Sequence, residues 1–266
     1  MTIIPNKYQE KFNSIEFFAT EKEVIDLLIN WKNKEGLYDL RHLYQSFDTD
    51  LKIKGLYIAT NVLRQELGFI KNEKPGDFDL IMIPYTENEI SFERTAVCEV
   101  KVVRPTRINP LRNANSMGTT QLNGLIKDGF PFVGLIHVSV TEPLKDDEKT
   151  TIKFCTLRAN SDDRIEEGKK FEDYLVEVKF DNFPWFSADK QLQRLVSLEI
   201  PKYVGLKCIG LIQNNGGHYT INAASRKYKG LETGYLNPHR KIETIEKIKN
   251  HYEHYPLKYF IRKMRK

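Results

Sequence analysis

Apolar and polar positions follow two different periods along the first part of the chain, and each period predicts a different element. Residues 21–31 place apolar side chains at helical spacing and predict an amphipathic helix. Residues 51–69 also show an apolar stripe that favours a longer helix, ended by the Pro-Gly pair at 75–76. The chain is therefore expected to begin with helices that have one apolar side.

Short apolar runs of strand length follow these helices. Residues 78–84 predict one strand, and residues 93–103 predict a second strand in which polar residues interrupt an apolar pattern. Residues 119–129 indicate a short helix stopped by glycine, and residues 130–140 predict a third, strongly apolar strand. The order helix, strand, strand, helix, strand implies an α/β sheet with helices packed against it.

The remaining part of the chain carries weaker signals. Residues 141–170 are polar and suggest a surface excursion, and residues 173–180 predict another strand. Residues 207–222 predict a hairpin that turns at Asn215-Gly216-Gly217, and residues 239–251 predict a closing basic helix.

These elements suggest one domain with additions at both ends. Residues 1–44 form an N-terminal helical region packed on the core, residues 45–237 form the core domain with its polar insertion near 141–170, and residues 238–266 form a basic C-terminal segment. The length of 266 residues suffices for this arrangement.

Composition narrows the class of protein. Apolar residues make up 40% of the chain and charged residues 29%, which is typical of a globular domain. No apolar run approaches the roughly 20 residues that a membrane span needs, and the N-terminus lacks the pattern of a signal peptide. The three cysteines Cys98, Cys155 and Cys208 are far apart and form no metal-binding pair, so we expect a reducing cytoplasm and no membrane partner.

Charge is unevenly distributed along the chain. Residues 238–266 hold nine Lys and Arg against three acids, a net of +6, so the rest carries −1 of the total +5. A basic segment on a near-neutral body suits a polyanionic partner, and a solvated helix and tail that only aid solubility is an equally good explanation.

The chemistry is concentrated in the segment Ala96–Val103. Side chains alternate along a strand, so Glu99 and Lys101 share the face opposite to Cys98 and Val100. A carboxylate and an ammonium on a central strand are costly unless they are solvated, paired or functional. We therefore expect them to point into a pocket or cleft, the alternative being an ion pair on a solvated face of the sheet.

A second carboxylate precedes the neighbouring strand. Asp79 lies directly before the apolar run that begins at Leu80, and the polar turn after that run predicts antiparallel neighbours. The start of the first strand then lies beside the end of the second, which brings Asp79 close to Glu99. Two carboxylates suit Mg²⁺ or Mn²⁺. Asp77 is a rival ligand, although it follows a Pro-Gly pair and suits the turn.

The pattern of Asp79, 19 intervening residues and Glu99-Val100-Lys101 resembles the PD-(D/E)XK nuclease superfamily, which includes restriction endonucleases. The resemblance covers residues 55–140 and implies a restriction-endonuclease-like core with a central mixed sheet flanked by helices. Glu66 and Gln121 match polar positions that several members carry on the helices before the first strand and after the Glu-x-Lys strand.

A second Glu-x-Lys occurs at Glu177 and Lys179. It lacks an acid that leads into an apolar strand, and no glutamine-bearing helix follows it, so the first motif is preferred.

The resemblance also implies a mechanism. Asp79, Glu99, the carbonyl of Val100 and Glu66 would bind Mg²⁺ or Mn²⁺, which activates water and neutralises the scissile phosphate. Lys101 would orient or deprotonate that water, and burial near a metal is a reason for a lowered pKa of its ammonium. Gln121 would position Lys101 or a phosphate.

Two groups of basic residues are candidates for contacts with nucleic acid. One group lies on the loop directly after the Glu-x-Lys strand, and the other lies in the basic C-terminal segment. They are Arg104, Arg107, Arg112, Lys258, Arg262 and Lys263. The expected partner is DNA, while RNA and a homodimer stay open. A C-terminal segment that docks on the body and is structural is the competing interpretation of the second group.

The expected function is metal-dependent hydrolysis of phosphodiester bonds in DNA, in restriction, phage defence or repair. Two alternatives remain: a nucleic-acid-binding protein that keeps the fold without cutting, and an α/β domain that binds another kind of partner. Metal-dependent cleavage and salt-dependent retention on DNA distinguish the three.

Overall fold

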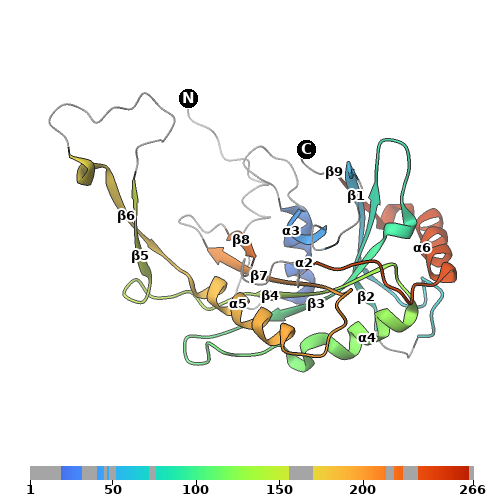
Figure 1. The fold of residues 1–266 in the computed structure, drawn as a ribbon, viewed down its shortest axis with the longest axis horizontal. Coiled ribbons are helices and arrows are strands. Elements are labelled where there is room, and N and C mark those ends of the chain that lie inside the picture. The colour runs from blue at the N-terminus through green and yellow to red at the C-terminus, as the bar shows by residue number, and fades with distance from the viewer. Residues whose placement is uncertain are drawn as a thin grey trace.

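A mixed sheet of seven strands organises the computed structural model, in the order β8-β7-β4-β3-β2-β1-β9 (Figure 1). Helices pack against both faces of this sheet, so the α/β class expected from the sequence is confirmed, and the architecture is consistent with a restriction-endonuclease-like core. The residues that the structure describes are 19–31, 41–44, 47, 52–71, 76–155, 170–213, 219–223 and 233–263.

The strands of the sheet are β1 Gly55–Val62, β2 Phe78–Tyr85, β3 Ala96–Val103, β4 Phe132–Ser139, β7 Gly205–Gln213, β8 Tyr219–Ala223 and β9 Phe260–Lys263. The α-helices are α2 Glu21–Asn30, α3 Arg41–Tyr44, α4 Thr119–Asp128, α5 Phe183–Val196 and α6 Ile242–His254. Short 3₁₀ helices are η1 Phe92–Arg94, η2 Asn115–Gly118, η3 Phe171–Tyr174 and η5 Pro256–Lys258. Strand β4 is parallel to both of its neighbours, β3 and β7, and the other neighbouring strands are antiparallel.

Most of the expected elements are confirmed. The helix over 119–129 is α4, and the strands over 78–84, 93–103 and 130–140 are β2, β3 and β4. The closing basic helix is α6. The hairpin near the C-terminal part is β7 and β8, and its turn at Asn215-Gly216-Gly217 lies outside the described residues.

The expected helix over residues 51–69 is wrong, because residues Gly55–Val62 form strand β1 instead. Strand β1 pairs with β2 on one side and with β9 on the other, and most of its side chains are buried. A strand covered on both faces is apolar throughout, so periodicity alone does not distinguish it from a buried helix. Glu66 therefore lies on the turn after β1 and not on a helix.

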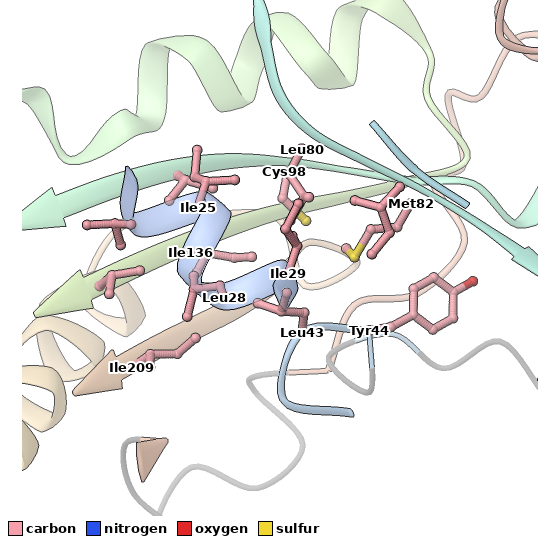
Figure 2. Packing of buried hydrophobic residues seen from close by; sticks show 14 of the residues in the cluster. Ile25, Leu28, Ile29, Leu43, Tyr44, Leu80, Met82, Cys98, Ile136 and Ile209 are labelled. Atoms are coloured by element: carbon pink, nitrogen blue, oxygen red, sulfur yellow. The ribbon is translucent and has the colours of Figure 1, made fainter. Parts of the chain in front are cut away.

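Two hydrophobic clusters hold the helices on opposite faces of the sheet. Figure 2 shows Ile25, Leu28 and Ile29 of α2 against Leu80 and Cys98 of the sheet. Helices α4, α5 and α6 contribute to the second cluster, on the other face. Because strand side chains alternate between faces, β3 supplies both clusters and lies at the centre of the fold.

Helix α2 starts at a defined residue. Thr20 and Glu23 form a reciprocal capping box, in which the threonine hydroxyl accepts the Glu23 N–H and the glutamate accepts the Thr20 N–H. This cap fixes where the first turn of the helix, and so Glu21, lies.

A two-stranded ribbon of β5 Thr150–Cys155 and β6 Leu175–Phe180 stands apart from the sheet (Figure 1). It occupies part of the polar excursion expected at 141–170 and the strand expected at 173–180. Among the described residues, no helix has the length and apolar character needed to cross a membrane.

A buried ion pair ties the turn after β1 to the end of α4. The guanidinium of Arg64 donates to both carboxylate oxygens of Asp128, at 2.7 and 2.8 Å, and to the carbonyl of Ile70 at 2.8 Å. Arg64 is only 1% exposed and lies against the rings of Phe69 and Phe78. Two parallel bonds satisfy both charges in a region that excludes water.

We expect Asp128→Asn to destabilise the protein by about 3–5 kcal/mol, because the Arg64 charge is then left buried without its carboxylate. Urea denaturation measures the loss. Glu87→Gln is the control, since Glu87 pairs with Lys54 on the surface and exposed pairs contribute little. Equal denaturation midpoints for the two variants would show that the buried pair contributes no more than a surface one.

Candidate active site

The antiparallel pairing of β2 with β3 brings the two predicted acids together. Leu80 pairs with Cys98, so the residues one step further along, Asp79 and Glu99, face each other at the end of the ladder. The Asp79 carboxylate accepts the backbone N–H of Val100 at 2.8 Å. Strand β3 continues beyond the start of β2, and the Asp79 side chain caps the N–H that would otherwise lack a partner there.

Glu99 and Lys101 lie side by side on one face of β3. Their neighbours Cys98 and Val100 face the α2 cluster, so the two charged side chains point to the opposite face. Glu99 is only 4% exposed, and its Oε1 lies 2.5 Å from the Lys101 ammonium. The charged pair predicted from the alternation is therefore partly buried and internally paired.

Gly118 brings the start of α4 against this pair. Its φ of +74° is left-handed, a conformation that favours glycine. A Cβ added to Gly118 would lie 2.7 Å from Leu135, 3.3 Å from the Cγ of Lys101 and 3.6 Å from the Cγ of Glu99. The left-handed φ and the short distance to Leu135 favour glycine here, and the Gly118 backbone packs against Lys101 and Glu99.

Burial dominates the electrostatics of the two acids. Burial, followed by the charge of Glu99, raises the pKa of Asp79 to about 7, although the Val100 hydrogen bond opposes the shift. Burial likewise raises the pKa of Glu99, against the opposing effect of Lys101. Glu21 adds to the repulsion at both carboxyl groups. Three acids thus face one ammonium in a poorly solvated place.

The pKa of Lys101 moves in the direction opposite to the expected one. Burial lowers it, but the hydrogen bond and charge of Glu99, helped by Glu21 and Asp79, outweigh burial and raise the pKa above its ordinary value. Lys101 is therefore a charged ammonium, which suits a hydrogen-bond donor and not a base.

Glu21 is the acid that sequence reasoning missed. It is the first residue of α2, half-buried, and it lines a cavity of about 330 Å³ together with Lys101 and Gln121. Arg104, Arg112 and Asn113 also line this cavity. The sequence Thr20-x-x-Glu23 marks the start of a helix and so was the available signal for an acid in its first turn, whereas the wrongly predicted helix at 51–69 led to Glu66.

Gln121 lies in the first turn of α4 and lines the same cavity. Its Oε1 is buried and has no hydrogen-bond partner among the residues that the structure describes. A buried acceptor without a partner costs free energy, so this oxygen suits a donor or a cation that enters the cavity.

The other predicted acids lie elsewhere. Asp77 is exposed and accepts the backbone N–H of Arg64 at 3.1 Å, so it serves the turn before β2. Glu66 binds the Lys258 ammonium at 2.6 Å and lies 3.8 Å from a ring nitrogen of His251. Glu66 does not lie on a helix, so the argument that gave it a role in metal binding does not hold. Glu177 of the second Glu-x-Lys pairs with Lys153 on the exposed ribbon.

The arginines after β3 differ in their contacts. The guanidinium of Arg104 donates to the carbonyl of Ala19, immediately before α2. Arg107 pairs with Glu142 at 2.9 Å and holds the base of the loop. Arg112 is exposed and lines the cavity, so it is the arginine of this group best placed to reach a bound ligand.

The basic C-terminal segment is engaged with the body. Lys258 binds Glu66, and Arg262 donates to the carbonyl of Ile29 at 3.1 Å and to Asn30 at 2.6 Å. Strand β9 completes the edge of the sheet, and its last residue, Lys263, is exposed. These contacts support the docked, structural interpretation for Lys258 and Arg262.

The residues present fit a hard divalent cation. Mg²⁺ is commonly bound through one or two carboxylates and several waters, and Asp79, Glu99 and the Val100 carbonyl supply oxygen donors of this kind. A bound cation would stabilise the ionised forms of the two buried acids, whose pKa values are raised, and could serve as a partner for the Gln121 oxygen. Within the described part of the chain, no three His, Cys, Asp or Glu side chains already converge as a metal site. One carboxylate oxygen of Glu99, Oε1, contacts the Lys101 ammonium.

Comparison with known proteins gives no relative: no family model, no curated protein and no solved structure matches the chain.

We expect Asp79→Asn to stabilise the metal-free protein by about 1–3 kcal/mol at pH 8, because it removes a buried carboxylate that its neighbours repel. The asparagine oxygen can still accept the Val100 N–H. A carboxyl group whose pKa is higher in the folded protein than in the unfolded chain lowers the free energy of unfolding as the pH rises between these two values, here from 3.8 to about 7. The gain should therefore grow over this window, and thermal melting in EDTA measures it.

Asp77→Asn is the matched control, since Asp77 lies two residues away and is exposed. It should change the melting temperature at pH 8 far less than Asp79→Asn does. A melting temperature for Asp79→Asn that is lower than that of the wild type at pH 8 would mean that Asp79 is not under electrostatic strain.

Proposed function

We propose that this chain is a Mg²⁺- or Mn²⁺-dependent nuclease of the PD-(D/E)XK type that hydrolyses phosphodiester bonds in DNA. The observation that carries the proposal is the convergence of Asp79, Glu99 and Lys101 on β3 and the start of β2, where burial raises the pKa of both carboxyl groups and Lys101 lines the cavity. Strained ionisable groups beside a cavity are typical of functional sites, because folding alone gives no reason to collect them.

In this proposal, Asp79, Glu99 and the Val100 carbonyl hold the metal, with Glu21 in place of Glu66 as the further acid. The bound metal would lower the pKa of a water and neutralise negative charge on the scissile phosphate. Asp79 is held in place by its bond to Val100, so its free oxygen keeps one direction. Glu99 is the mobile partner, because its present bond is to the flexible Lys101 side chain.

Lys101 and Gln121 would act on the phosphate and the water. The ammonium of Lys101 stays charged and therefore donates hydrogen bonds to the oxygens on which negative charge develops. The unpartnered oxygen of Gln121 accepts a hydrogen bond from the attacking water or from Lys101. Together they orient the nucleophile against the phosphorus, and such positioning lowers the barrier by making the attack effectively unimolecular.

Nucleic acid would follow the cavity past Lys101 toward the loop after β3. Arg112 and Asn113 line this stretch and offer donors for phosphate oxygens. DNA is the proposed substrate, and RNA is the alternative substrate. A homodimer is compatible with this proposal. The proposal includes a cytoplasmic location, which agrees with three cysteines that are all free thiols.

A non-cutting nucleic-acid-binding protein is the second candidate. The observation that favours it is that Glu99 is already neutralised by Lys101 and that no three-residue metal group is assembled among the described residues. Such a protein would bind DNA with the same salt dependence, but without metal-dependent cleavage.

We expect the purified protein to cleave plasmid or linear DNA in Mg²⁺ or Mn²⁺ and to be inactive in excess EDTA. Glu99→Gln and Lys101→Met should each slow cleavage roughly 100-fold or more, since each removes a group that stabilises the transition state. Gel assays at saturating DNA measure the rates. The second motif offers matched controls, because Glu177→Gln and Lys179→Met change the same residue types on the exposed ribbon.

Loss of activity in the ribbon variants with full activity in Glu99→Gln would move the site to the second motif. DNA binding without cleavage under every metal would leave the non-cutting candidate.

The contacts of two arginines predict opposite results on DNA binding. Arg112→Ala should weaken binding and flatten the slope of log K against log salt by about 0.9, the value for one lost phosphate contact. Arg262→Ala should lower the melting temperature and leave the slope unchanged, because Arg262 is bonded to α2. Fluorescence anisotropy across a salt series measures both slopes. A flatter slope for Arg262→Ala alone would return the basic C-terminal segment to the binding surface.

A further inference from the structure

A buried histidine lies directly behind the candidate site. His137 on β4 is the parallel partner of Lys101 on β3 and is 0% exposed. Its Nε2 lies 3.1 Å from the carbonyl oxygen of Met117, and its Nδ1 lies 3.4 Å from Oε1 of Gln191 on α5. The neighbours of His137 in sequence, Ile136 and Val138, are apolar core residues, so a polar ring at this position needs a reason.

The ring can satisfy only one of its two partners. Burial lowers the pKa of His137 to about 4, so the imidazole is neutral and carries one N–H. Met117 and Gln191 both offer acceptor oxygens, because the Gln191 amide nitrogen already donates to the carbonyl of Arg112 at 2.9 Å. The shorter contact, to Met117, takes the proton. His137 therefore donates to the backbone of the segment that leads into α4.

That segment has a strained backbone. Met117 has a φ of +52° and Gly118 a φ of +74°, so two consecutive residues are left-handed. A non-glycine residue in this region is strained and persists only where its surroundings hold it. The hydrogen bond from His137 to the Met117 carbonyl is a specific contact at the strained residue.

The strained turn sets the position of the site residues. Gly118 approaches the side chains of Glu99 and Lys101, and Gln121 follows one turn later on α4. The middle of the same loop is held by α5, because Gln191 binds the Arg112 carbonyl and Arg194 binds the carbonyl of Leu111 at 2.8 Å. The loop is therefore held by α5 at its middle and by His137 near its end.

We propose that His137 is a positioning residue, which holds the left-handed Met117–Gly118 turn through the Met117 carbonyl and thereby fixes Gly118 against Lys101 and sets the start of α4 that carries Gln121. This proposal rests on the proposed function for its catalytic consequence. Its structural part concerns only the turn and stands independently of any activity.

Two substitutions at His137 separate the hydrogen bond from mere packing. His137→Gln keeps a donor near the place of the ring Nε2, whereas His137→Leu fills the same space without a donor. Measured at saturating Mg²⁺ and DNA, His137→Leu should lower kcat about 10–100-fold with little change in KM, because a displacement near 1 Å disturbs positioning far more than binding. His137→Gln should recover kcat to within about threefold of the wild type.

Hydrogen exchange supplies a readout that needs no activity. In His137→Leu, the backbone amides of residues 117–122 should exchange faster than in the wild type, whereas those of α2 should not change. His137→Gln should restore the slow exchange. If the leucine variant does not fold, His137→Asn replaces it, since its shorter side chain cannot reach the Met117 carbonyl.

Met117→Gly in the leucine background tests the strain directly. Glycine adopts the left-handed conformation without the steric cost, so the double variant should recover part of both the kcat and the slow exchange. His251→Leu is the control for losing a buried histidine, because His251 contacts the Tyr259 hydroxyl at 2.8 Å away from the site. It should lower the melting temperature and leave kcat and exchange in α4 unchanged.

Unchanged exchange at residues 117–122 in a folded His137→Leu protein overturns the proposal. The proposal is also overturned if a folded His137→Gln protein has the same low kcat and the same fast exchange at residues 117–122 as His137→Leu. The hydrogen-bond donor would then not be the cause of either effect. A wild-type protein without cleavage under any metal ends the proposed function, and the exchange experiment still decides whether His137 holds the turn.

Discussion

The site depends on one pairing, the antiparallel ladder between β2 and β3. Its register places Asp79 where β2 begins, so that the carboxylate accepts the N–H of Val100 and faces Glu99. A shift of one residue would turn Glu99 and Lys101 into the apolar cluster under α2 and would turn Cys98 and Val100 to the opposite face. The apolar residues on both faces therefore fix the chemistry, because the register that buries them also brings the acids together.

The remaining parts of the site are brought to β3 from three directions. Helix α2 contributes Glu21 from one face, and its start is held by the bond from Arg104 to Ala19. Helix α4 contributes Gln121 from the other face. Helix α5 holds the loop between β3 and α4, because Gln191 binds the carbonyl of Arg112. Each contact is made to the backbone, which limits how far the side chains can move.

Local patterns in the sequence were sufficient to predict the central strands and the proximity of Asp79, Glu99 and Lys101, because alternation and strand order follow from neighbouring residues. They failed for β1, which is buried on both faces and resembles a helix in periodicity. Because of that error, Glu66 was predicted as the third acid of the site. Glu21 was not predicted, since its position depends on the tertiary packing of α2. The pairing partners of Lys258, Arg262 and His137 lie far away in the sequence, so composition gave no indication of them.

The bond between Glu99 and Lys101 makes the carboxylate a place for which two cations compete. A metal that bound Oε1 of Glu99 would compete with the ammonium for this oxygen, and a displaced ammonium would lie at the cavity that Lys101 and Arg112 line. Binding of the metal and binding of an anion would favour each other by the same factor, as thermodynamic linkage requires. Lys101 would thus be the counter-ion of Glu99 in the absence of a metal. When a metal is bound, the Lys101 ammonium would be available to pair with an anionic group of the substrate.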